Sequence, residues 1–460
     1  MSEIFKAVNR QLKCGFRPVE NVYKAAGKGI TGQGSAAMLT RMGLAKTGPT
    51  RTGTEQLRQQ NSALVLSALR RQGLLAHTEI GAATGLASAT VSAITADLER
   101  AGIIEKSEQP PQPGIASGRG RPRVLFGQRR DCGYVITASI SSDMIQYSLV
   151  DYAGTLLDRF SEPRGQADVQ AFGQAISAAL ERLVTRSRIE RAAVLAISIS
   201  SKGLVDAAHP VLLWSPVLGA AAVDFSDLLG SSWAARIILS NETLLVAEAL
   251  RARQAKSGEV VTELAALSLG HSIGLGIARQ SASGEAEVLA PNFGHMLHLA
   301  QGGLCRCGAR GCIEAYAGFY AILRAAFEVP DDTIPAKFVP VVEIDRIALQ
   351  ARQGHRRAQF AFRQAGVAFG NGLSRLFSLH GHMPVFLTGP GTRYQDLLQA
   401  GLEEGLSQSQ TVRLSGMPKL TVVADEPSLV FEGHQNLAFS LVDRDIVLAR
   451  PNLAAAAAGA

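Results

Sequence analysis

Hydrophobic positions recur at helical spacing in the stretch LRQQNSALVLSALRRQG, which begins at residue 57. Four leucines follow this spacing: Leu57, Leu64, Leu66 and Leu69. They predict a helix that ends at Gly73. The next stretch, HTEIGAATGLASATVSAITADLERAGIIEK, contains two short helical patterns that are broken at Gly85. Because glycine tolerates the positive φ of a tight turn, we expect two helices joined by a turn in a domain that covers residues 56–110.

Beyond residue 130 the pattern changes to short apolar runs that alternate with helical patterns. Strands are predicted at residues 132–140, 144–151, 192–200, 236–240, 263–270, 273–278 and 383–389. Helices are predicted at residues 170–184, 243–255 and 355–379. The first two strands are separated by a few polar residues, which favours antiparallel pairing. These elements predict an α/β domain over residues 131–450.

The charge distribution sets the front of the chain apart. The formal net charge is +7, but residues 1–130 carry 19 Lys and Arg against 8 Asp and Glu. This excess predicts a nucleic-acid-binding module on a nearly neutral body. Residues 1–55 are basic and weakly periodic, so we expect a flexible extension. Residues 111–130 are rich in Pro, Gly and Arg and predict a linker, and residues 451–460 form a low-complexity tail.

Composition excludes other classes of protein. Hydrophobic residues make up 47% of the chain and charged residues 18%, which is typical of a folded core and excludes wholesale disorder. The N-terminus lacks the apolar run of a secretory signal, and no stretch reaches the roughly 18 apolar residues of a membrane span. We therefore expect a cytoplasmic protein without membrane contact.

The second helix of the basic module has the features of a recognition helix. Small and polar residues lie on the outer face of its N-terminal end: Ser88, Ala89, Thr90 and Ser92. Apolar residues of both helices would hold them together: Ile80, Leu86, Val91, Ile94 and Leu98. In the linker, Arg119 and Arg121 flank a glycine and suit insertion into a narrow minor groove of double-stranded DNA. The alternative is a helical bundle with a solvated face and a flexible tether.

Three of the five cysteines lie within eight residues, and a histidine precedes them. The spacing His295-x9-Cys305-x-Cys307-x4-Cys312 supplies three thiolates and one imidazole, the ligand set of a closed, structural Zn2+ site. Gly308 would let the backbone wrap closely around the ion, and so would Gly311. The alternative is a set of buried, inert cysteines.

Several motifs together resemble the ROK family, which includes repressors and sugar kinases. The segment FGHMLHLAQGGLCRCGARGCIEAYAG, residues 293–318, resembles the zinc signature of the family. Weaker matches are GLASATVSAITADLERAGII, GRP at 120–122, KGLVD at 202–206 and LTGPG at 387–391. The resemblance covers residues 57–450. It implies an N-terminal winged helix-turn-helix, followed by a two-lobed actin/hexokinase-like (ribonuclease H-like) α/β domain with a structural zinc loop at 295–314.

The resemblance also implies a sugar site, and it allows the motifs of the family's kinases to be compared with this sequence. The positions that bind the sugar in the family are here Asn241, Glu242, Asn292, His295 and Glu314. Asn241, His295 and Glu314 match the family pattern, whereas Glu242 and Asn292 depart from it. Residues 139–143 lack the glycines of the first phosphate loop of the kinases, and residues 270–274 depart from the second. Glu242 stands at the position of the kinase base, so we expect no catalytic residue and no kinase activity.

These observations predict a repressor of genes for carbohydrate uptake or catabolism. The protein would bind operator DNA as a homodimer or homotetramer, and a carbohydrate effector would modulate that binding. Two alternatives remain at this stage. One is an ATP-dependent sugar kinase with an added DNA-binding domain, and the other is a regulator that responds to a protein partner instead of a sugar.

Overall fold

The computed structural model describes residues 53–108, 124–165, 169–206, 208–216, 218, 222–257, 262–280 and 286–449. Almost all of the expected extension, Arg119 and Arg121 of the linker, and the tail lie outside these residues. Among the described residues, no helix is long and apolar enough to cross a membrane.

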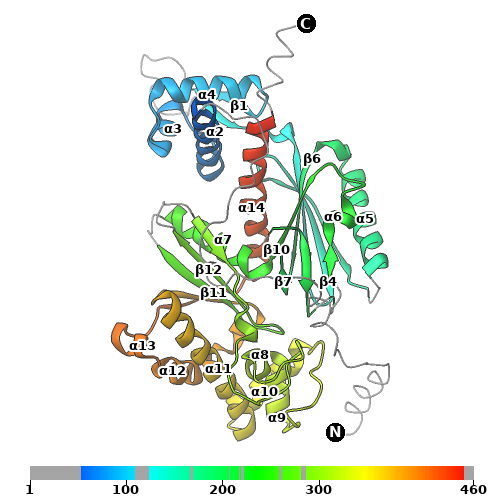
Figure 1. Cartoon of the computed structure of the whole chain (residues 1–460), viewed down its shortest axis with the longest axis vertical. Helices are drawn as coiled ribbons and strands as arrows, with labels where there is room; N and C mark the ends of the chain where they lie inside the picture. The colour runs from blue at the N-terminus through cyan, green and yellow to red at the C-terminus, as the bar shows by residue number, and fades with distance from the viewer. Residues whose placement is uncertain are drawn as a thin grey trace, which may run out of the picture. The chain divides into compact units, whose positions relative to one another are not determined.

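The described part of the chain begins with a small module of three helices and two strands (Figure 1). Its helices are α2 (Gly53–Gln72), α3 (His77–Thr84) and α4 (Ser88–Arg100). Gly73 follows α2 with φ +80°, and Gly85 ends α3 with φ +72°, the left-handed conformation that glycine tolerates. Glu79 caps the start of α3, where its carboxylate accepts a 2.8 Å hydrogen bond from the amide of Ala76.

A short antiparallel sheet completes this module. Strand β1 (Ile104–Glu108) pairs with β2 (Val124–Gln128). The linker expected at 111–130 therefore contains a strand, and the module extends past residue 110. The interhelical core matches the expectation, with Ile80, Val91, Ile94 and Leu98 buried and Leu86 packed against them. The predicted leucine stripe of the first helix is only half correct, because Leu57 is 57% exposed and Leu64 is 45% exposed.

The first sheet of the α/β domain has five strands in the order β10-β6-β3-β4-β5. Its strands are β3 (Tyr134–Ile140), β4 (Met144–Asp151), β5 (Leu156–Pro163), β6 (Val194–Ser201) and β10 (Arg236–Asn241). As expected, β3 and β4 are antiparallel. Strand β6 runs parallel to β3, and β10 runs parallel to β6. Nearby lie α5 (Val169–Arg186), α6 (Phe225–Leu229) and a small sheet of β7 (Leu204–Val205), β8 (Val211–Trp214) and β9 (Val223–Asp224).

A second five-stranded sheet has the order β13-β12-β11-β14-β15. Its strands are β11 (Glu263–Ser268), β12 (Gly274–Gln280), β13 (Ala286–Leu289), β14 (Val385–Thr388) and β15 (Leu420–Val422). Helices that belong to this half are α8 (Glu314–Ala317), α9 (Phe319–Ala326), α10 (Val341–Arg352), α11 (Arg356–His380), α12 (Gln395–Ser407) and α13 (Gln410–Ser415). Every strand and helix predicted from the apolar pattern forms.

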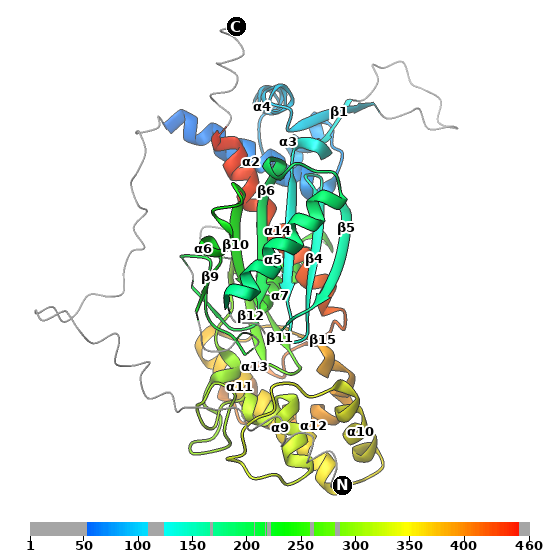
Figure 2. The same ribbon diagram turned by 90° about the vertical axis from the view of Figure 1, so that its right-hand side faces the viewer.

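Two helices connect these parts. Helix α7 (Glu242–Ser257) follows β10, and the C-terminal helix α14 (Glu426–Ala449) packs along it (Figures 1 and 2). Helix α14 also contacts β3 and β6 of the first sheet and α2 of the N-terminal module. At that end, Arg70 of α2, which is half-buried, forms an ion pair with the buried Asp443 of α14, with 2.8 Å between Nη2 and Oδ1. One helix thus contacts both the module and the α/β domain.

Candidate functional site

The structure brings the histidine and the three clustered cysteines together. The ligand atoms of His295, Cys305, Cys307 and Cys312 all lie within 4.8 Å of one another. His295 ends a short 3₁₀ turn (Phe293–His295), and Cys312 lies just before α8. Cys305 and Cys312 are buried, whereas His295 and Cys307 are half-buried. Hydrogen bonds with the thiols of Cys305 and Cys312 lower the pKa of Cys307 below its ordinary value.

The spacing of these atoms fits a tetrahedral metal site. The sulfurs of Cys307 and Cys312 are 3.7 Å apart, and the sulfur of Cys305 is 3.5 Å from Nδ1 of His295. Around a tetrahedral ion with metal–sulfur bonds of about 2.3 Å and metal–nitrogen bonds of about 2.0 Å, these distances would be about 3.8 and about 3.5 Å. The four side chains are therefore already arranged as ligands around a common centre.

Glycine is required where the loop turns. Gly308 has φ +88° and Gly311 has φ +77°, as the sequence predicted for a backbone that wraps around an ion. A Cβ atom at residue 311 would lie 1.8 Å from the carbonyl oxygen of Leu299. Both the conformation and the lack of space exclude a side chain at this position.

An arginine of this loop reaches Glu314 at the start of α8. Nε of Arg306 donates a 3.1 Å hydrogen bond to Oε1 of Glu314, and the amide of Ile273 donates one of 3.1 Å to Oε2. The side chains of Arg306 and Glu314 are 8% and 1% exposed. The same guanidinium donates to Ser272 at 3.0 Å and to the carbonyl of His271. Arg306 therefore connects the metal loop to both α8 and the loop at 270–274.

A second part of the site lies at the junction of β10 and α7. The amide nitrogen of Asn241 donates to the carbonyl of Gly203 at 2.7 Å, and its oxygen accepts from the amide and hydroxyl of Thr243 at 2.9 and 2.7 Å. The next residue, Glu242, is buried, and its Oε2 lies 3.7 Å from Nζ of Lys202. Burial raises the pKa of Glu242 to about 7, although Lys202 opposes that shift.

Lys202 links the two parts of the site. Burial lowers the pKa of Lys202, but three nearby carboxylates outweigh this effect and raise the pKa above its ordinary value. They belong to Glu242, Glu426 and Glu314. Glu242, Glu314 and Lys202 therefore belong to one electrostatic cluster. His295 lies close to Trp214, with 5.3 Å between the ring centres. Asn292 is exposed, just before the 3₁₀ turn that carries His295.

The sequence prediction missed the two cations of this cluster. Lys202 follows β6 directly, and Arg306 stands between two metal-ligand cysteines. The available signal was a long basic side chain next to residues already assigned to the site. His271 in the neighbouring loop is neutral at physiological pH, because burial, Lys202 and Arg306 lower its pKa to about 4.

The predicted recognition residues lie at the start of α4. Ser88, Ala89 and Ser92 are exposed and Thr90 is half-buried, while Val91 on the opposite side is wholly buried. This face is therefore open to a partner.

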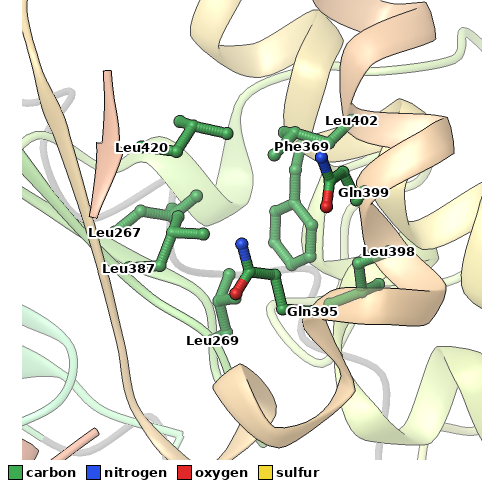
Figure 3. Close-up of a pocket in the computed structure, with 9 residues that line it drawn as sticks. All are labelled: Leu267, Leu269, Phe369, Leu387, Gln395, Leu398, Gln399, Leu402 and Leu420. Atoms are coloured by element: carbon green, nitrogen blue, oxygen red, sulfur yellow. The ribbon is translucent and has the colours of Figure 1, made fainter. Parts of the chain in front are cut away.

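An apolar pocket between the second sheet and helices α11 and α12 is not a ligand site. Figure 3 shows leucines, Phe369 and the amides of Gln395 and Gln399 around it. Its volume is about 10 Å³. That is room for one water molecule at most, so the pocket is a packing gap in the core.

Comparisons with known proteins agree on one family. The profile of the ROK family matches residues 136–411. A xylose repressor of Caldicellulosiruptor bescii is 23% identical over 360 residues, which are 76% of this chain and 88% of the repressor. A glucokinase of Streptomyces coelicolor is 25% identical over 258 residues, which are 54% of this chain and 78% of the kinase.

A solved structure has a similar fold over most of the chain. It is a ROK family transcriptional regulator, described as a homolog of the Escherichia coli MLC protein. The two structures superpose with a TM-score of 0.65 at 19% sequence identity, and the match covers 85% of this chain and 100% of the regulator.

Proposed function

The chain belongs to the ROK family, and on this premise we propose that it is a transcriptional repressor whose binding to operator DNA responds to a sugar. The observation that carries the proposal is the N-terminal module joined to an α/β domain of the family. The sequence match to the xylose repressor covers 76% of the chain, whereas the sequence match to the glucokinase covers 54%. The additional length accommodates a DNA-binding module. The regulated genes would serve carbohydrate uptake or catabolism, because the similar repressor is named for xylose.

The N-terminal module is, in this proposal, a winged helix-turn-helix. Helix α4 would enter the major groove, and β1 and β2 would form the wing. The base-facing residues would be Ser88, Ala89, Thr90 and Ser92. Arg119 and Arg121, which lie outside the described residues, would enter the minor groove beside the wing. A homodimer or homotetramer would place two modules on two half-sites.

The sugar would bind at the cluster around Lys202. Its predicted contacts are Asn241, Glu242, Asn292, His295 and Glu314. The nearby metal centre would hold Zn2+ through His295, Cys305, Cys307 and Cys312, because three thiolates and an imidazole suit this ion. Its role would be structural, since four protein ligands leave no open position for chemistry.

We infer that the chain is not a sugar kinase. A kinase needs a base that is free to take a proton from the sugar hydroxyl. Glu242 stands at the position of that base, but its side chain is one methylene longer than the aspartate of the family's kinases, so its carboxylate would be displaced from the sugar hydroxyl. Asp143 stands where the first phosphate loop of the kinases carries a phosphate-binding threonine, and its carboxylate would repel a nucleotide. Incubation with ATP and sugars should therefore give no sugar-dependent ADP release.

The test is genome-wide capture of DNA bound to the tagged protein, followed by affinity measurements on the enriched site. Enrichment beside genes of sugar uptake or catabolism would support the proposal.

A carboxylate on the DNA-facing side of α4 would repel the phosphates, so Ser92→Glu should weaken operator binding at least 100-fold. Ser378→Glu, the same change at an exposed site on α11, should leave affinity within twofold.

Two results would overturn the proposal. One is the absence of specifically enriched DNA. The other is unchanged operator affinity across a panel of neutral and acidic sugars, which would favour control by a protein partner.

A further inference from the structure

Several hydrogen-bond acceptors of the predicted sugar site already bond to the protein. Oε1 of Glu314 accepts from Arg306 and Oε2 accepts from the amide of Ile273. The side-chain oxygen of Asn241 accepts twice from Thr243. Glu242 faces Lys202. Each hydroxyl of a neutral sugar donates one hydrogen bond and can accept two, and the bonds within the protein leave fewer acceptors for its protons.

The two cations of the cluster, Arg306 and Lys202, differ in how many hydrogen bonds they donate to the protein. Arg306 is 8% exposed and donates to Glu314, to Ser272 and to two backbone carbonyls, those of His271 and Lys337. Its role is therefore to position Glu314 and the loops around it. Lys202 is 23% exposed, and the 3.7 Å between its Nζ and Glu242 exceeds a hydrogen bond. The ammonium group therefore retains donors that a ligand can use.

The position of Lys202 places these donors at the sugar site. Lys202 is followed directly by Gly203, whose carbonyl accepts the hydrogen bond of Asn241. Its charge also interacts with Glu314 and Glu426. A partly exposed cation is thus surrounded by side chains that the family resemblance assigns to the sugar.

We propose that the effector is a sugar acid, and that Lys202 binds its carboxylate. The inference deepens the proposed function, on which it rests for the assignment of this cluster to a sugar. A carboxylate on the ligand would accept a charge-assisted hydrogen bond from Nζ, which is stronger than a bond to a neutral hydroxyl. The ammonium group of Lys202 would then leave its ion pair with Glu242 and pair with the carboxylate of the ligand.

Charge balance favours a carboxylate over a phosphate. The cluster contains the cations Lys202 and Arg306 together with the acids Glu242, Glu314 and Glu426. Burial raises the pKa of Glu242 to about 7, so this group can become neutral when Lys202 turns to the ligand. A sugar phosphate brings nearly two negative charges next to the remaining carboxylates, and the repulsion would oppose its binding.

Calorimetric titration of the full-length protein tests this inference without DNA. The probes are matched pairs, D-xylose with D-xylonate and D-glucose with D-gluconate and D-glucuronate, together with glucose 6-phosphate. At least one acid should bind ten times more tightly than its neutral counterpart, and more tightly than the phosphate.

Variants of Lys202 test whether this residue causes the preference for an acid over the neutral sugar. Lys202→Met should weaken binding of the preferred acid at least tenfold more than binding of its neutral counterpart, whereas a structural defect would weaken both to the same extent. Lys202→Arg keeps the charge and should retain most of the preference. Lys256→Met, the same change at an exposed position of α7, should bind like the wild type.

The outcomes separate this inference from the proposed function. Tighter binding of a neutral sugar or of the phosphate, or no binding of any acid, would overturn the sugar acid. So would an acid preference that survives Lys202→Met. In each case the operator measurement still decides whether the chain is a repressor. An acid that binds through Lys202 would support the inference even if no operator were found.

Discussion

His434 is wholly buried in α14 among serine hydroxyls of the first sheet. Its Nδ1 lies 2.8 Å from Oγ of Ser198, and its Nε2 lies 3.0 Å from Oγ of Ser200. Burial lowers its pKa to about 3, from 6.5. As the pH falls below 6.5 the unfolded chain takes up a proton that the folded protein does not. Stability should therefore fall by about 1.4 kcal/mol per pH unit between pH 6.5 and 3 from this group alone.

Replacement of the imidazole removes this dependence. The free energy of unfolding of His434→Gln, measured in urea between pH 7 and 4.5, should decrease less steeply with acid than that of the wild type. Glu242 contributes the opposite slope between about 4.5 and 7, but it is present in both proteins and cancels in the difference. His355→Gln, at an exposed position, serves as the control. Parallel curves for the wild type and His434→Gln would show that His434 accepts a proton in the folded state.

Local sequence predicted that His295 and the three cysteines would cluster, but not the ion pairs beside them. The four ligands and two glycines lie within one short stretch, so their spacing alone indicates a common centre. Lys202 and Glu242 are far apart in sequence and meet because parallel strands β6 and β10 end side by side. Nothing near Lys202 in the sequence indicates that contact. The pairing of Arg306 with Glu314 likewise depends on how the metal loop folds back onto α8.

The metal loop, from His295 to Glu314, should depend on its ion for order. Removal of zinc would leave three close thiols and would release the loop that positions Glu314. We expect one zinc per chain by metal analysis. A strong chelator should lower the melting temperature by several degrees, and Cys307→Ser should have a similar effect in the absence of chelator.

Ala309→Ser is the matched control for this loop, because residue 309 is exposed and contributes only backbone contacts to it. It should bind zinc and melt like the wild type. A wild-type protein that contains no zinc, or a melting temperature that chelation does not change, would contradict a structural metal.

Two of the elements that escaped prediction did so for clear physical reasons. Strand β2 is short and lies in a region rich in Pro, Gly and Arg, and it exists because β1 provides a partner. Helix α14 has no single apolar face, since it packs against α7, the first sheet and α2 together. Leu429 and Phe439 are both buried, but in different clusters of the core. A helix with several neighbours loses the simple periodicity by which amphipathic helices are found.

Helix α14 also connects the N-terminal module, which we propose binds DNA, with the proposed sugar site. Near its first turn, Glu426 accepts a 3.0 Å hydrogen bond from Thr388 and interacts with Lys202. Near its last turns, Asp443 pairs with Arg70 and accepts a 2.6 Å hydrogen bond from Tyr152. The guanidinium of Arg70 also lies 3.9 Å from the ring centre of Phe439. A displacement of α14 by the effector would therefore change the contacts of the module.

Loss of the Arg70–Asp443 pair should uncouple sugar from DNA. Arg70→Met leaves a buried carboxylate without its partner, which should cost about 3–5 kcal/mol in urea unfolding. The double variant Arg70→Met, Asp443→Leu removes both charges and should regain most of that stability.

The double variant should still bind the operator tightly. Its affinity, measured by fluorescence anisotropy, should change less than twofold when the effector is added. Arg71→Met, exposed on α2, should keep the full response. A double variant that still responds like the wild type would place the coupling outside α14.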